Sequence, residues 1–211
     1  MLSKKLILNL CVSSLVFFFV VLLSIFYLDR ELVFILKGNI IANNFLKELN
    51  YIVLIPPVLF VISPFLIFII LLKYIYTKSY IKLEVVLVLS AMSVLISTSI
   101  KSILKFIFSR DNIYMLTHSN SYKFHWFKDE HSWSSFPSGH AVVMISATTL
   151  FWYAYPRYRL FYILFNILVM LALLLLSFHF ISDLIGSIFF GYWISYFTYC
   201  VFSDLVKKKY F

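Results

Sequence analysis

The sequence predicts an all-α membrane protein, a bundle of six transmembrane helices with both termini on the cytoplasmic side. Of its 211 residues, 63% are hydrophobic and only 13% are charged, whereas ordinary soluble domains have about 45–50% apolar and about 25% charged residues. The mean hydropathy is +0.95. This composition excludes a soluble globule, which needs a polar surface, and the aromatic content of 20% excludes a disordered chain.

Six stretches are long and apolar enough to cross a hydrocarbon core, which requires about 20 helical residues. They cover residues 6–28, 51–72, 84–108, 138–155, 160–178 and 184–203. The basic start before the first stretch resembles a signal peptide, but the apolar run is too long and no cleavage site follows, so we expect a retained helix. Pro56, Pro57 and Pro64 are expected to kink the second stretch. We expect residues 1–211 to form a single integral-membrane domain.

The last stretch carries small residues four positions apart, in the pairs Ser182/Gly186 and Ser187/Gly191. Small residues at this spacing let two membrane helices approach closely. We therefore expect this helix to pack tightly on a neighbour, with the small residues positioning the site rather than acting in it.

The positions of the basic residues predict the orientation, because cytoplasmic loops are rich in Lys and Arg. One set of helix ends holds ten of the eighteen: Lys4, Lys5, Lys73, Lys78, Lys82, Arg157, Arg159, Lys207, Lys208 and Lys209. In the opposite loops, six basic residues are balanced by six acidic ones. The first set is therefore predicted to be cytoplasmic. Topology thus explains the net charge of +9, and no nucleic-acid partner is predicted.

The string Phe136-Pro137-Ser138-Gly139-His140 stands directly before the fourth stretch. Ser138 is suited to cap a helix, and Gly139 allows an anion to approach the backbone. A helix N-terminus attracts anions through its free N–H groups and its dipole, which would place His140 beside a bound anion. The alternative is an ordinary helix start that happens to contain a histidine.

His179 and Asp183 are four residues apart at the start of the last stretch, so they share one face of a helix. A carboxylate there can accept the imidazole N–H and leave the other ring nitrogen as a nucleophile. The alternative is a satisfied polar pair at a helix end, although ionisable groups near hydrocarbon are candidates for function. With the N-terminus inside, both histidine segments fall on the outer face.

Basic residues mark the outer end of the third stretch, where Lys105 and Arg110 precede the long loop 109–137. Two cations at the mouth of a cleft can hold a phosphate, although snorkelling to the surface is the alternative. Lys101 lies too deep to snorkel easily, so we expect a polar cavity or partner around it. Metal binding is a further interpretation of the five histidines, but no His-x-x-x-His pair occurs, and we predict no metal site.

These motifs, in this order, resemble the type 2 phosphatidic acid phosphatase (PAP2) and vanadium haloperoxidase superfamily, in particular its membrane lipid phosphate phosphatases. The motifs cover residues 100–190, and the six-span topology covers the whole chain. Lys105 matches the family's first lysine, and Arg110 matches a frequent extra arginine. Asn112 and Leu173 stand where the family usually has two further arginines.

The resemblance implies the role of each residue. His179 would attack phosphorus and form a phosphohistidine, Asp183 would orient it, and His140 would protonate the leaving oxygen and then activate water. The phosphoryl oxygens would be held by Lys105, Arg110, Ser138 and Gly139. Lys123 and His125 are candidates for a supplementary donor from the long loop, with Lys101 in reserve. No metal or other cofactor is implied.

The implied function is a membrane lipid phosphatase acting on an outer-leaflet lipid phosphate, with membrane lipids as its surroundings. Candidate substrates are phosphatidic acid, phosphatidylglycerol phosphate, undecaprenyl diphosphate and lipid A phosphates. The expected location is a bacterial inner membrane, with the site facing the periplasm or the exterior. The alternatives are a lipid phosphotransferase using the same histidine chemistry and a weakly active lipid-binding relative.

Overall fold

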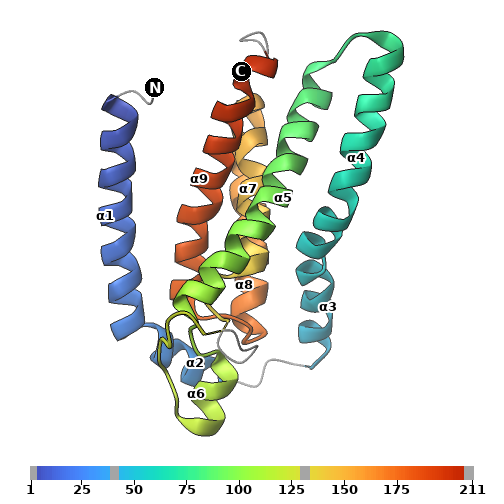
Figure 1. Cartoon of the computed structure of the whole chain (residues 1–211). Coiled ribbons are helices and arrows are strands. Elements are labelled where there is room, and N and C mark those ends of the chain that lie inside the picture. The colour runs from blue at the N-terminus through green and yellow to red at the C-terminus, as the bar shows by residue number, and fades with distance from the viewer. Residues whose placement is uncertain (1–3, 39–42, 129–133, 207–211) are drawn as a thin grey trace.

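The computed structural model describes residues 4–38, 43–128 and 134–206, and Figure 1 shows them as a bundle of helices. In chain order these are α1 (Lys4–Tyr27), α2 (Asp29–Gly38), α3 (Asn43–Val53), α4 (Ile55–Thr77), α5 (Lys82–Phe108), α6 (Ile113–Ser119), α7 (Gly139–Ala154), the 3-10 turn η2 (Pro156–Tyr158), α8 (Arg159–Leu175) and α9 (Ile181–Val206). The predicted all-α class is confirmed for this part of the chain.

Five segments of the described chain are long and apolar enough to cross a membrane. They are Leu8–Tyr27, Lys47–Thr77, Lys82–Phe108, Pro156–Leu175 and Ile181–Phe202, and they correspond to five of the six predicted stretches. The remaining stretch, 138–155, folds as α7, whose 16 residues extend about 24 Å. This length is somewhat less than the hydrocarbon thickness of about 30 Å, so a sixth crossing stays a prediction.

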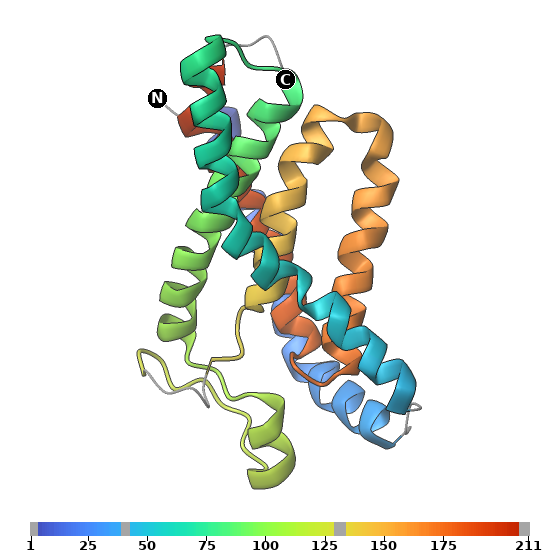
Figure 2. The same cartoon turned by 90° about the vertical axis from the view of Figure 1, so that its right-hand side faces the viewer.

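The second predicted stretch is divided into two helices. The break lies at Leu54, between α3 and α4, and Pro56 and Pro57 occupy the first turn of α4. Proline has no N–H for a helical hydrogen bond, so it fits a first turn but disrupts the helix before it. Pro64 lies inside α4 without ending the helix. The expected kink is therefore at Pro56 and Pro57, and Figure 2 shows α3 and α4 crossing the bundle obliquely.

Helix α7 lies at the centre of the bundle, in contact with α4, α5, α8 and α9. Most of its side chains are buried. Two hydroxyls tie its backbone to its neighbours: Ser90 Oγ of α5 donates to the Ala147 carbonyl (2.7 Å), and Ser195 Oγ of α9 donates to the Ser146 carbonyl (3.0 Å). Such bonds fix the position of α7, whose first turn carries His140.

The small residues of α9 permit close packing, as predicted. A Cβ atom at Gly191 would lie 2.9 Å from both the Val142 carbonyl oxygen and Ile145 Cβ of α7. A Cβ atom at Gly186 would lie 2.6 Å from the ring of Phe136. Both distances are shorter than a normal carbon contact, so only glycine allows α9 to lie this close to α7 and to the segment before it.

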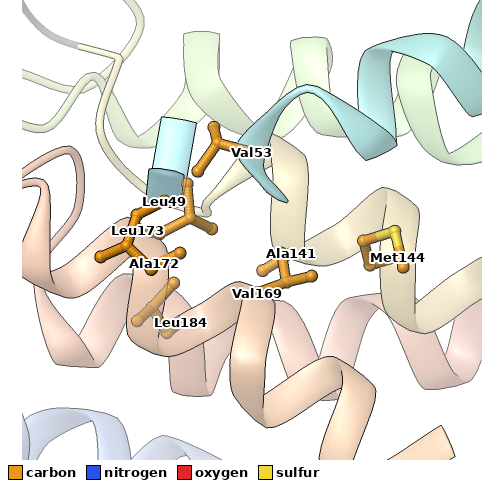
Figure 3. Close-up of a cluster of buried hydrophobic side chains, with 8 residues drawn as sticks. All are labelled: Leu49, Val53, Ala141, Met144, Val169, Ala172, Leu173 and Leu184. Carbon is orange, nitrogen blue, oxygen red and sulfur yellow. The ribbon is translucent and has the colours of Figure 1, made fainter. Parts of the chain in front are cut away.

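A buried apolar cluster joins four helices beside the first turns of α7 and α9 (Figure 3). Its members are Leu49 and Val53 of α3, Ala141 and Met144 of α7, Val169, Ala172 and Leu173 of α8, and Leu184 of α9. The cluster anchors α3 against α8, which places the junction between α3 and α4 next to the starts of α7 and α9.

The helix ends that carry the predicted motifs gather at one end of the bundle. Figure 1 shows α5 ending there, α9 beginning there, and α2 and α6 beside them. Helix α1 begins and α9 ends at the opposite end (Figure 1). The two histidine segments therefore share one end of the molecule, as the span count predicts.

Candidate active site

His140 stands in the first turn of α7, which Ser138 caps. The Ser138 side chain accepts a hydrogen bond from the Ala141 N–H (3.5 Å), and its own N–H donates to the Asp183 carbonyl (3.4 Å). Ser187 Oγ of α9 donates to the Ser138 carbonyl (3.1 Å). Serine is favoured at this position because its oxygen satisfies one of the free first-turn N–H groups. The start of α7 is thus fixed to the start of α9.

His179 lies in a bend two residues before α9, and Asp183 lies in the first turn of that helix. The prediction that the two share one helical face is therefore wrong, although their side chains still approach each other. His179 Nδ1 is 3.5 Å from Asp183 Oδ2, slightly longer than a hydrogen bond. This nitrogen is buried and has no hydrogen-bond partner among the described residues. With Nδ1 turned towards the carboxylate, Nε2 is the ring nitrogen left for a substrate.

The Asp183 carboxylate is fully buried and held by three donors. Arg110 Nη1 donates to Oδ1 (2.5 Å), while Ser135 Oγ (2.5 Å) and the Phe180 N–H (3.0 Å) donate to Oδ2. Hydrogen bonds to a charged carboxylate favour its ionised form. Asp183 is therefore arranged as a fixed negative charge beside His179.

Arg110 lies inside the protein rather than at a cleft. Its side chain is 1% exposed. Besides Asp183, it donates to Ser182 Oγ (2.7 Å), Asp29 Oδ2 (2.6 Å) and the Tyr122 hydroxyl (2.6 Å). Burial alone would lower the pKa of Arg110, but Asp183 and Asp29 outweigh it and raise the pKa above its usual value. Protein groups occupy both terminal nitrogens of Arg110 in this arrangement, so its predicted contact with the substrate phosphate stays a prediction.

Asp29 completes this network from the other end of the chain. It is 1% exposed, and its Oδ1 accepts the Ser182 N–H (3.0 Å) at the start of α9. The Tyr122 hydroxyl donates to Asp29 Oδ2 (2.7 Å). Burial raises the pKa of Tyr122 above its usual value and Asp29 raises it further, so the phenol stays protonated as a donor.

Two lysines of α5 approach the start of α7. Lys105 Nζ donates to the Ser134 carbonyl (2.5 Å), in the segment that leads into the Pro-Ser-Gly-His string. Lys101 Nζ lies 3.1 Å from the position that a Cβ atom would take on Gly139. Lys101, the reserve candidate in the sequence, therefore lies against the motif itself.

The two loop candidates lie elsewhere. His125 Nε2 is paired with Asp111 Oδ1 at 2.8 Å, and the Lys123 side chain is exposed. Neither lines the cavity that contains the two histidines. Lys101 and Lys105 do not line that cavity either, but they lie against the segment that leads into and begins α7. Asp111 also accepts the Lys123 N–H (2.8 Å), so these residues shape the loop.

His140 and His179 line one cavity of about 430 Å³. Phe178 and four residues around the junction of α3 and α4 form the rest of its lining: Asn50, Val53, Leu54 and Pro57. One wall of the cavity is therefore largely apolar, and both histidines line the same space. This arrangement allows one histidine to attack a bound group while the other transfers a proton.

Sequence reasoning missed Asp29, Ser135 and Tyr122 as parts of the site. One signal was available for Asp29, because it is a carboxylate two residues after the end of a 24-residue apolar helix. Ionisable residues so close to hydrocarbon usually have a partner, but the sequence does not say which basic residue that partner is.

Comparison with known proteins agrees with the motifs. A family model described as the PAP2 superfamily matches residues 84–207. The crystal structure of the first transmembrane PAP2-type phosphatidylglycerolphosphate phosphatase from Bacillus subtilis is similar in fold, with a TM-score of 0.52 at 14% identity, over 92% of this chain and 98% of that one. A search of curated proteins finds no match. Since the family model covers more than half of the residues, including both histidine motifs, the chain belongs to the PAP2 superfamily.

Proposed function

We propose that this protein is a membrane lipid phosphatase that hydrolyses a phosphomonoester or diphosphate of a lipid through a phosphohistidine intermediate. The observation that carries the proposal is the shared cavity of His140 and His179, with Asp183 beside Nδ1 of His179. A nucleophile, a proton-transfer group and an orienting carboxylate are the parts that such a reaction requires.

In the first step, His179 Nε2 attacks phosphorus, and a nitrogen–phosphorus bond forms as the bond to the lipid oxygen breaks. Protonated His140 gives its proton to that leaving oxygen. The phosphorylated imidazole keeps its Nδ1 proton and becomes positively charged. Asp183, already ionised through Arg110 and Ser135, stabilises this charge.

In the second step, neutral His140 takes a proton from water as the water oxygen attacks phosphorus. The nitrogen–phosphorus bond breaks, inorganic phosphate leaves, and His179 returns to its neutral form. The charge on the phosphoryl oxygens is balanced by Lys105 and by the first-turn N–H groups of α7 at Gly139, which have no partner within the helix. Ser138 holds that turn in place and presents its hydroxyl beside it. No metal or other cofactor takes part in these steps.

The largely apolar wall formed by Val53, Leu54 and Pro57 supports a lipid substrate. A lipid tail can lie along it while the phosphate reaches the histidines. We propose that the substrate comes from the outer leaflet, that α7 makes the sixth crossing, and that both termini are cytoplasmic in a bacterial inner membrane. The charge distribution supports this orientation.

Phosphate release from a panel of lipid phosphates tests the function, using purified protein in vesicles. Wild type should release phosphate, and His179→Ala should abolish release and the acid-labile phosphoenzyme. His118→Ala is the matched control, because His118 is exposed in α6 and stacks on Tyr114. Activity in His179→Ala, or transfer of the phosphate to a second lipid in place of release, would contradict the proposal.

Orientation is tested separately by labelling intact cells with a membrane-impermeant maleimide. Single cysteines at Lys123 and Lys78, in a background with Cys11 and Cys200 replaced by Ser, report the two ends of the bundle. Labelling at position 123 but not at 78 is expected. The reverse pattern would place the site on the cytoplasmic side.

A further inference from the structure

Lys101 lies on α5 where the start of α7 approaches it. Its Cδ and Nζ atoms are 3.0 and 3.1 Å from the Cβ position of Gly139, so the side chain fills the space that any larger residue would need. Lys101 and Lys105 are four residues apart and therefore share one face of α5. Both ammonium groups are thus directed to the segment that leads into and begins α7.

Nothing in the described residues balances the charge of Lys101. It forms no hydrogen bond or ion pair with any of them, whereas Lys105 bonds to the Ser134 carbonyl. Two like charges four residues apart on one helix repel each other, and the partial positive charge of the α7 N-terminus adds to this repulsion. A lysine within a membrane helix is also costly unless its ammonium group is paired or solvated. The unpaired ammonium group of Lys101, the neighbouring Lys105 and the start of α7 together indicate an anion between them.

The other cations of the region are unsuitable for this anion. Arg110 is occupied by Asp29 and Asp183. At the two positions where the family usually has arginine, Asn112 caps α6 by accepting the Met115 N–H (3.0 Å), and Leu173 is buried in the apolar cluster. Besides the first turn of α7, the described groups next to this position that can neutralise a phosphate are therefore Lys101 and Lys105 of α5.

We propose that Lys101 is a second ammonium contact to the substrate phosphate, and that Lys101 and Lys105 together select a dianionic phosphoryl group. This inference rests on the proposed function. A terminal phosphomonoester carries nearly two negative charges at neutral pH, which matches two ammonium groups. A phosphodiester headgroup carries only one, so its binding leaves one lysine unbalanced.

The test compares Lys101→Met with wild type in phosphate release from a lipid phosphomonoester. Loss of one charge-assisted contact should lower kcat/KM by roughly 10- to 100-fold, and Lys101→Arg should restore part of it. Lys82→Met is the matched control at the opposite end of the same helix, and it should keep wild-type activity. Equal activity of Lys101→Met and wild type would overturn the inference while leaving the phosphatase proposal standing.

Thermal stabilisation by inorganic phosphate gives a readout that does not depend on turnover. Phosphate should stabilise wild type and Lys82→Met, but stabilise Lys101→Met much less. If inorganic phosphate stabilises the wild-type protein but that protein releases no phosphate from any lipid, the Lys101 contact stands and the proposed function fails. Equal stabilisation of wild type and Lys101→Met would refute the contact.

Gly139→Ala provides an independent variant, because the new methyl group displaces the end of Lys101. It should lower kcat/KM, and the Gly139→Ala/Lys101→Met double variant should lose less than the two single losses combined. Fully additive losses would show that Gly139 and Lys101 act separately, which contradicts a shared phosphate site.

Discussion

Replacing Arg110 by Met should destabilise the protein more than replacing Asp29 by Asn. Asp29, Arg110 and Asp183 are ionised groups in direct contact, with a net charge of about −1. Arg110→Met leaves two buried carboxylates without their cation. Asp29→Asn leaves the neutral pair of Arg110 and Asp183, and its side-chain oxygen can still accept the Ser182 N–H.

The magnitudes follow from burial. Breaking a buried ion pair by removing one partner costs about 3–5 kcal/mol, which for a chain of this size lowers the unfolding temperature by roughly 6–20 °C. Asp29→Asn weakens hydrogen bonds but leaves no unpaired ion, and we expect a loss of about 1–3 kcal/mol. The double variant carries a single buried carboxylate, so it should be more stable than Arg110→Met alone.

Thermal unfolding in detergent, followed by tryptophan fluorescence, measures this order. Arg157→Met is the control, because Arg157 is exposed and its loss should change stability by less than about 0.5 kcal/mol. The reasoning fails if Asp29→Asn is as unstable as Arg110→Met, or if the double variant unfolds below Arg110→Met.

Further outcomes follow from the same geometry. His140→Ala should lower turnover by about 10²- to 10⁴-fold while a labelled phosphoenzyme still accumulates. If no phosphoenzyme accumulates, the proposed role of His140 in proton transfer is contradicted. Ser135→Ala removes a donor to Asp183 and should lower kcat about tenfold with little change in KM. A change confined to KM would contradict the role of Ser135 in holding Asp183. Gly191→Val should destabilise by about 1–3 kcal/mol through overpacking against α7, measured by thermal unfolding beside the exposed control Val201→Ala. EDTA should leave phosphate release unchanged, and orthovanadate should inhibit it. If EDTA abolishes phosphate release and an added divalent metal restores it, a metal-dependent mechanism is favoured instead.

Local properties of the chain were sufficient to predict most of the helices. Apolar length located the membrane-spanning segments, because crossing hydrocarbon depends on a run of residues rather than on distant contacts. The position of the break between α3 and α4 follows equally from Pro56 and Pro57. The short helices α2 and α6 were not predicted, since neither is long enough to cross a membrane and their apolar residues are buried only in a tertiary cluster with Phe180.

The roles of the charged residues depended on distant partners. Arg110 has the right sequence position for a phosphate ligand, but Asp29, 81 residues earlier, and Asp183, 73 residues later, bury it between them. Lys123 and His125 looked suitable because they flank an aromatic residue, yet Asp111 holds His125 away from the cavity. Lys101 was held in reserve because of its depth in the membrane helix, and the sequence does not show that Gly139 at the start of α7 lies against it.

The position of Asp29 limits how the protein can be divided. The segment that defines the family begins at residue 84, whereas the carboxylate that pairs with Arg110 and fixes the start of α9 comes from the junction of α1 and α2. A recombinant fragment restricted to residues 84–207 would carry every motif histidine but leave Arg110 with one counter-ion fewer. Grafting this catalytic segment onto another membrane scaffold would therefore require a substitute acid at the place that Asp29 occupies.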